Sequence, residues 1–85
     1  MPFSTPFYSK QIMNDIPVGS TAKILGYTAH NAFTERLREF GLVAGTLIKV
    51  LRKAPFNGPV EIQYRHSRII LRSDETQHIT LEHIR

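Results

Sequence analysis

The chain has 85 residues, 41% of them hydrophobic, which is enough apolar material for one small core and excludes a two-domain enzyme. Its formal net charge is +4 at pH 7, and the surplus lies in the middle third, because residues 46–72 carry six Lys or Arg against one Glu. A positive field of this kind favours an anionic partner, which can be nucleic acid, a lipid headgroup surface or an acidic protein face.

Cysteine is absent, so disulfides, thiolate metal sites and cysteine nucleophiles are excluded. The N-terminal residues lack the basic and apolar regions of a signal peptide, and no run approaches the ~18 apolar residues that a membrane span needs. We therefore expect a soluble cytoplasmic protein.

Residues 1–11 form a separate segment, in which two prolines and three aromatic residues follow no helical or strand periodicity. Chain ends of this kind are poorly ordered unless other contacts hold them. We expect an N-terminal arm over 1–11 and one domain over 12–85. The arm either packs loosely or docks its aromatics on a neighbouring surface or a second copy; these aromatics are Phe3, Phe7 and Tyr8.

One helix is expected, over residues 32–40. Asn31 is a good N-cap, and Gly41 supplies a left-handed stop after the last turn. A helix of about nine residues is too short to be stable alone, so we expect its apolar stripe to be buried against strands. The stripe follows i, i+4, i+7 spacing and consists of Phe33, Leu37 and Phe40.

The remaining predicted elements are strands. A turn at 15–20 leads into the first strand, and a connection bracketed by glycines at 41–45 precedes the others; the strand-like segments are 22–27, 46–53, 60–65, 68–72 and 79–81. Two prolines and an Asn-Gly pair make 54–59 a defined loop. His66-Ser67 fits a two-residue hairpin connection, and Ser73 is expected to cap a single helical turn over 73–77.

Five short strands with one inserted helix predict an all-β fold. The fold class is a small five-stranded SH3-like barrel with one short α-helix inserted after the first strand. Closure of the barrel would remove the exposed edges that an open five-stranded sheet presents.

Alternation along the strands divides the side chains into an inner and an outer set. The inner set is Ile48, Val50, Val60, Ile62, Tyr64, Ile69 and Leu71. The outer set is Leu47, Lys49, Leu51, Lys53, Arg65, Arg68, Ile70 and Arg72. This mixture of cations and aliphatics fits either a solvated face whose aliphatics other parts of the chain cover, or a docking patch with an apolar centre and a basic rim.

No motif for catalysis is present. Residues 19–23 lack the second glycine and the spacing of a phosphate-binding loop, and the nucleophile-elbow, zinc-protease and EF-hand patterns are absent. A barrel of this size also offers little concave volume from which water could be excluded. We therefore expect no enzyme activity, no catalytic residue, no cofactor and no small-molecule substrate.

A cluster of His78, Glu82 and His83 near the C-terminus raises the question of a metal site. On a strand that rises about 3.3 Å per residue, His78 and Glu82 lie ~13 Å apart, and the adjacent Glu82 and His83 point to opposite faces. One ion cannot bind all three side chains within one chain, so no metal ligand is assigned.

Four motifs follow one another in a characteristic order: Ile16-Pro17-Val18-Gly19, the segment from Arg36 to Thr46 with its Gly41-Leu42-Val43-Ala44-Gly45 junction, the segment from Ala54 to Val60, and Leu71-Arg72. Together, over about residues 12–84, they resemble the FeoA family of ferrous iron transport accessory proteins. Ala44 stands where that family usually carries proline, and His66-Ser67 replaces a connection that often includes glycine.

This resemblance implies a small SH3-like cytoplasmic protein that promotes or regulates bacterial Fe²⁺ uptake. It implies binding to FeoB, a membrane transporter with a GTP-binding cytoplasmic domain, and recruitment to the inner membrane through it. The expected contact residues lie on the basic strands and the 54–59 loop, although the prolines of that loop equally fit a rigid turn. They are Leu47, Lys49, Leu51, Lys53, Pro55, Phe56, Arg68, Ile70 and Arg72. Weak self-association is left open.

A second hypothesis is a nucleic-acid-binding small barrel, which the basic middle third favours. Base stacking needs outward aromatic side chains, and Tyr64 belongs to the inner set. We therefore place protein binding ahead of nucleic-acid binding.

Overall fold

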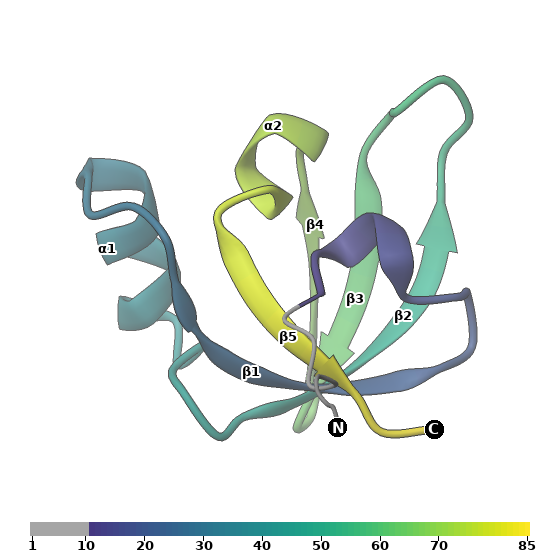
Figure 1. The fold of residues 1–85 in the computed structure, drawn as a ribbon, viewed down its shortest axis with the longest axis horizontal. Coiled ribbons are helices and arrows are strands. Elements are labelled where there is room, and N and C mark those ends of the chain that lie inside the picture. The colour runs from purple at the N-terminus through teal and green to yellow at the C-terminus, as the bar shows by residue number, and fades with distance from the viewer. Residues whose placement is uncertain (1–10) are drawn as a thin grey trace, which may run out of the picture.

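The computed structural model of the chain describes residues 11–85. Its strands form one antiparallel sheet in the order β4-β3-β2-β1-β5, with the helix α1 at one end of the molecule and the β2–β3 loop projecting at the other (Figure 1). The number of strands and the helix after the first strand are as predicted. In chain order the elements are η1 (Met13–Asp15), β1 (Thr21–Tyr27), α1 (Ala32–Glu39), β2 (Leu47–Lys53), β3 (Val60–Tyr64), β4 (Ser67–Leu71), α2 (Ser73–Thr76) and β5 (Ile79–His83). Apart from Gln11, the expected arm lies outside the described residues.

The sheet curls around one hydrophobic core. The inner set predicted by alternation is confirmed: all of its members are buried except Ile69, which is half-buried and packs against the others. Burial of one such side chain stabilises the fold by about 1.5–3 kcal/mol, so the core is the main source of stability. The other parts of the chain contribute Met13, Ile16, Ala22, Ile24, Leu37, Leu42, Ile79 and Leu81.

The two edge strands of the sheet differ. Strand β5 pairs with β1 on one side, and on the other side Leu81 exchanges two backbone hydrogen bonds with Gln11, at 2.9 and 2.7 Å. Because both edges of β5 are occupied at Leu81, no ladder joins it to β4 within residues 11–85. The expected five-stranded SH3-like barrel is thus present among the described residues, without a β4–β5 ladder to close it.

Helix α1 begins and ends where its sequence signals predict, within one residue. The side-chain oxygen of Asn31 accepts hydrogen bonds from the backbone N–H groups of Phe33 and Thr34, both at 3.0 Å. Gly41 adopts φ +99° and donates to the carbonyl of Arg38 at 2.9 Å. This left-handed residue satisfies a terminal carbonyl and turns the chain back toward the sheet.

The buried stripe expected on α1 is wrong at its last position. Leu37 is buried and Phe33 is half-buried against the core, but Phe40 is 51% exposed. Phe40 is the C-cap and keeps helical backbone angles, so it continues the direction of the stripe but is only partly covered at the end of the helix. Thr34 takes the remaining buried position, and its hydroxyl donates to the carbonyl of Asn31 at 3.1 Å.

Two local assignments also differ from the expectation. The N-cap of α2 is Arg72, not Ser73, because the carboxylate of Glu75 accepts a hydrogen bond from the Arg72 N–H at 2.9 Å. In the β3–β4 hairpin Tyr64 pairs with Ser67, so the turn consists of Arg65 and His66, and Arg65 adopts φ +56°.

Candidate docking surface

Two rows of side chains cross the outer face of β2, β3 and β4. The register sets Glu61 opposite Arg52 on one side and Ile70 on the other. Directly opposed residues of an antiparallel sheet share a face, so these three side chains form one row. By the same argument, the second row consists of Lys49, Gln63 and Arg68.

A bulge in β2 changes the outer set after residue 50. The register shifts between Val50 and Arg52, so Arg52 faces outward and Lys53 lies opposite the buried Val60. The outward assignment of Lys53 is therefore wrong, because strict alternation fails where one strand contains an extra residue. Lys53 is half-buried, and its ammonium nitrogen donates to the carbonyl of Asn14 at 3.2 Å. Leu51, at the bulge, is half-buried as well.

Glu61 is the single acidic side chain on this part of the face, and two arginines share it. Its carboxylate lies 3.9 Å from Arg52 and 3.9 Å from Arg68, with both arginine side chains more than 70% exposed. Exposed pairs at this distance contribute about 1 kcal/mol or less, so they orient the arginines more than they stabilise the fold. The face keeps an excess of positive charge.

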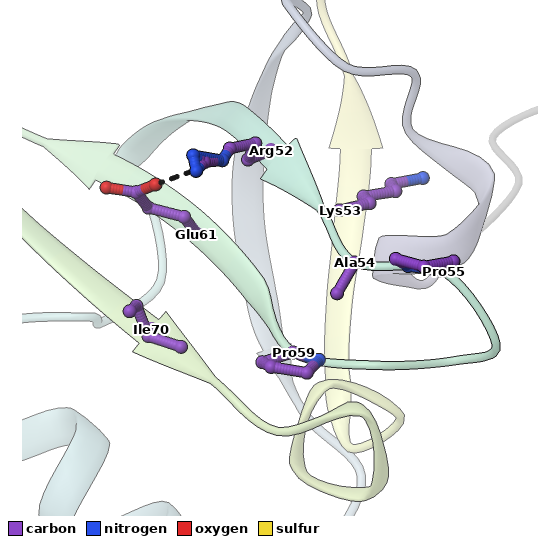
Figure 2. A pocket seen from close by; sticks show the side chains of 7 residues that line it. All are labelled: Arg52, Lys53, Ala54, Pro55, Pro59, Glu61 and Ile70. Atoms are coloured by element: carbon purple, nitrogen blue, oxygen red, sulfur yellow. Dashed lines mark ion pairs between the residues drawn. The ribbon is translucent and has the colours of Figure 1, made fainter.

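The first row borders a shallow hollow of about 380 Å³ at the end of the face that carries the β2–β3 loop (Figure 2). Ile70, which is 66% exposed, lies at one side of this hollow, and the loop lies at the other. The residues that line it are Arg52, Lys53, Ala54, Pro55, Pro59, Glu61 and Ile70. Aliphatic and proline carbons thus form its apolar surface, with charged groups at the side.

The loop itself is a tight turn that exposes Phe56. The N–H of Gly58 donates to the carbonyl of Pro55 at 3.1 Å, and both central residues are left-handed, with φ +59° at Phe56 and +58° at Asn57. This conformation suits Asn or Gly and costs other residues about 1–2 kcal/mol. The side chain of Phe56 is 98% exposed.

Gly58 keeps this turn narrow. A Cβ atom at Gly58 would lie 2.6 Å from the Cβ of Ala54 and 3.0 Å from the carbonyl oxygen of Pro55. The N–H of Ala54 donates to the carbonyl of Pro59 at 2.9 Å, which closes the base of the loop. Only glycine allows this close approach.

The other expected contact residues lie around these features. Leu47, 54% exposed, and Lys49 border a second hollow of about 330 Å³ together with Thr21, Gln63 and Arg65. A third hollow, of about 390 Å³, lies beside the β2–β3 loop and includes Arg72. The expected contact residues are therefore distributed over three hollows and the β2–β3 loop, with Leu51 half-buried and the ammonium group of Lys53 bonded to Asn14.

Arg52 and Glu61 are the main residues that the sequence interpretation missed. Glu61 lies between the buried Val60 and Ile62, so alternation alone could have placed it on the outer face. Arg52 could not be found in this way, since no residue in its neighbourhood signals the bulge.

A smaller cluster lies between α1 and β1. The hydroxyl of Tyr27 donates to the carbonyl of Leu42 at 2.6 Å, and the guanidinium of Arg38 lies 5.2 Å from the centre of the Tyr27 ring. Burial raises the pKa of the Tyr27 hydroxyl above its ordinary value of 10.0, while the nearby Arg38 acts in the opposite direction. Arg38 also pairs with Glu35 at 3.2 Å.

The described residues contain no group of three His, Cys, Asp or Glu side chains placed to hold a metal ion. Strand β5 runs through Glu82 and His83, and Glu82 lies 3.8 Å from Lys23 across the sheet. None of the helices found between residues 11 and 85 has the length and hydropathy of a membrane-spanning segment.

The strand order, the curled core and the helix α1 after the first strand define a small SH3-like β-domain. Residues 13–83 match the FeoA domain family. The chain therefore belongs to the FeoA family.

Individual relatives agree with this assignment. A Campylobacter jejuni protein named as an Fe(2+) transport protein A is 30% identical over 67 residues, which cover 79% of this chain and 90% of that protein. The solution structure of a FeoA protein from Chlorobium tepidum is 29% identical, with a TM-score of 0.80 over 88% of this chain and 71% of that one. The crystal structure of Stenotrophomonas maltophilia FeoA complexed with zinc, described as an SH3 domain protein, is 25% identical, with a TM-score of 0.74 over 85% and 89% of the two chains.

Proposed function

We propose that this protein is a cytoplasmic accessory protein of bacterial ferrous iron uptake that regulates a FeoB-type transporter by binding its cytoplasmic GTPase region. Membership of the FeoA family supports the iron transport role, as do the names of its relatives, one of which is presented as a candidate activating factor for ferrous iron transport. Binding at the transporter brings the protein to the inner membrane.

The observation that carries the binding role is the composition of the outer face. Ile70 and Leu47 are each more than half exposed there, among cations that outnumber the acidic side chains. Apolar groups within a polar and Arg-containing rim are typical of protein interfaces. An acidic surface is the complementary partner.

The same face supports binding over catalysis. Its hollows are shallow surface depressions, and the one of about 380 Å³ places a single carboxylate, Glu61, beside arginine. General acid–base chemistry needs ionisable groups that converge on a site protected from water. We therefore assign no reaction to the protein.

The test is a titration of the purified chain against the full-length transporter embedded in lipid nanodiscs. We expect Ile70→Glu and Arg52→Gln each to raise the Kd at least about tenfold, as changes at central contact residues do. Arg36→Gln is the matched control, because Arg36 is an exposed cation on α1, at the far end of the molecule (Figure 1). It should change the Kd by less than about twofold.

Circular dichroism and the melting temperature must show that each variant is folded. If both variants on the outer face bind like the wild type, the contact surface lies elsewhere. If the wild-type chain does not bind the transporter at all, regulation by direct contact is wrong.

Nucleic-acid binding is not proposed. On the strands β2 to β4 the aromatic side chain is Tyr64, which is buried and donates its hydroxyl to the carbonyl of Phe40, so the exposed ring of Phe56 in the loop is left without a neighbouring ring on these strands for stacking several bases. A titration with single-stranded RNA at rising salt checks this conclusion. Affinity that falls steeply with salt would contradict it, since such a slope reports contacts to several phosphates.

A further inference from the structure

Phe56 is unfavourable in the free protein in two independent ways. Its ring is 98% exposed, so it contributes no packing to the core. Its backbone, at φ +59°, lies in the left-handed region, which disfavours aromatic residues. Neither the conformation of the turn nor the stability of the fold therefore accounts for a phenylalanine at this position, and such outliers often mark functional sites.

The turn holds this ring in a defined position. Pro55 and Pro59 restrict the backbone on both sides, and the hydrogen bond from Gly58 to Pro55 closes the turn at 3.1 Å. The 2.6 Å approach that a Cβ at Gly58 would make to Ala54 shows how closely the two arms of the loop pack. Because the backbone of the turn is already fixed, binding through the ring does not require the loop to become ordered, and only the side chain loses conformational freedom.

The charges near the turn are set back from its tip. Arg52 lies against Glu61 at 3.9 Å, and the ammonium nitrogen of Lys53 donates to the carbonyl of Asn14. Both side chains border the hollow behind the loop (Figure 2). The tip thus carries one aromatic ring and the uncharged Asn57, and the cations Arg52 and Lys53 are held away from it by Glu61 and by the Asn14 carbonyl.

This arrangement fits a protein pocket better than a bilayer. A peripheral membrane anchor combines an apolar insertion with free cations at the same depth, which attract anionic headgroups. Here the ring projects ahead of Arg52 and Lys53, which already have partners within the chain. An apolar pocket with an acidic rim would receive the ring and meet Arg52 and Lys53 at its border.

We propose that the turn from Pro55 to Gly58 is a preformed anchor that inserts the Phe56 ring into an apolar, acid-rimmed pocket of the partner protein. The proposal rests on the proposed function for the identity of that partner, the cytoplasmic region of the ferrous iron transporter. The ring is the central contact, and its exposure and backbone strain are tolerated in the free protein because they are offset on binding.

The experiment separates the ring from the backbone. Phe56→Asn removes the ring and introduces a residue that tolerates the left-handed conformation. Phe56→Leu keeps an apolar side chain on the same strained backbone. Asn57→Gly changes the neighbouring left-handed residue and leaves the ring in place. Each full-length variant is titrated against the transporter in nanodiscs with anionic lipid and against empty nanodiscs of the same lipid. The melting temperature of each free variant is measured in parallel.

We expect Phe56→Asn to raise the Kd for the transporter at least about tenfold while its melting temperature stays equal or rises. Phe56→Leu should lose less affinity than Phe56→Asn, and Asn57→Gly should bind within about twofold of the wild type. Empty nanodiscs should bind none of the chains measurably.

Three results would overturn the anchor alone. Phe56→Asn could bind the transporter like the wild type, which would remove the anchor and leave the proposed function intact. Phe56→Asn could destabilise the free protein, in which case the ring has a structural role. Empty nanodiscs could bind the wild-type chain but not the Phe56→Asn variant, which would identify the bilayer as the target of the ring. Failure of the wild type to bind the transporter would instead remove the proposed function, and the anchor with it.

Discussion

The phenolic oxygen of Tyr64 lies 3.0 Å from the carbonyl oxygen of Phe40, and it donates a hydrogen bond to it. Tyr27 makes the equivalent contact on the other side of Gly41, with the carbonyl of Leu42 at 2.6 Å. Side chains from β1 and β3 thus hold the two residues that flank the left-handed Gly41. The exit of α1 is fixed to the sheet by side chains as well as by its own backbone, which allows so short a helix to be stable.

Tyr27→Phe tests the second of these contacts. The change removes the hydrogen bond to Leu42 and leaves the carbonyl without its partner, so we expect a loss of about 1 kcal/mol in the free energy of unfolding at pH 7. Urea denaturation of the two proteins measures the difference. A variant as stable as the wild type would show that the Leu42 carbonyl is equally well hydrated.

The pH dependence of the same pair of proteins tests the environment of the hydroxyl. Burial raises the folded-state pKa of Tyr27 above 10.0, so the contribution of Tyr27 to stability is fully present below about pH 10. As the pH rises past the unfolded-state pKa of Tyr27, its hydroxyl loses a proton in the unfolded chain but keeps it in the folded chain. The stability that Tyr27 contributes therefore falls with pH until the folded-state pKa is reached. The free energy of unfolding should therefore fall more steeply between pH 9 and 11 for the wild type than for Tyr27→Phe. Parallel slopes would contradict the raised pKa.

Arg65→Gly should stabilise the protein. Arg65 occupies φ +56° in the β3–β4 turn, where glycine has no steric cost, so we expect a gain of about 0.5–1 kcal/mol in the free energy of unfolding. Arg65→Ala is the matched control, since it removes the same charge but keeps the strained backbone. An equal gain from alanine would assign the effect to the charge and not to the backbone.

Gly58→Ala should destabilise the β2–β3 loop. The new Cβ would lie 2.6 Å from the Cβ of Ala54, so the loop must open, at a cost of about 1–3 kcal/mol. Gly26→Ala is the control, because a Cβ at Gly26 has no heavy atom within 4 Å. Thermal denaturation should separate the two variants, and similar melting temperatures would mean that the narrow loop is not needed for stability.

The features that could be predicted from the sequence depend on local signals. Asn31 and Gly41 determine where α1 begins and ends, since each is among the few residues suited to its cap position. The alternation in Val60, Ile62 and Tyr64 determines which face of β3 is buried, because a half-buried strand has a period of two.

The features that were missed depend on contacts between elements. The bulge between Val50 and Arg52 belongs to the register of β2 on β3, which no residue of β2 signals by itself. The pairing of Gln11 with Leu81 on the outer side of β5 joins residues seventy positions apart along the chain, so no local pattern signals it. For the candidate site, alternation placed Lys49, Arg68 and Ile70 on the outer face, but the strained backbone of Phe56 became visible only with backbone angles.

A comparison of Leu37→Ala with Phe40→Ala tests the corrected buried face of α1. Leu37 is 2% exposed within the core, so its truncation should cost about 2–5 kcal/mol, measured by urea denaturation. Phe40 is 51% exposed at the C-cap, and because half of its surface is already in water, its truncation should cost clearly less, about 1 kcal/mol. The larger aromatic side chain would thus give the smaller effect. If Phe40→Ala proves as damaging as Leu37→Ala, the simple seven-residue stripe is right after all, and Phe40 packs against the core in solution.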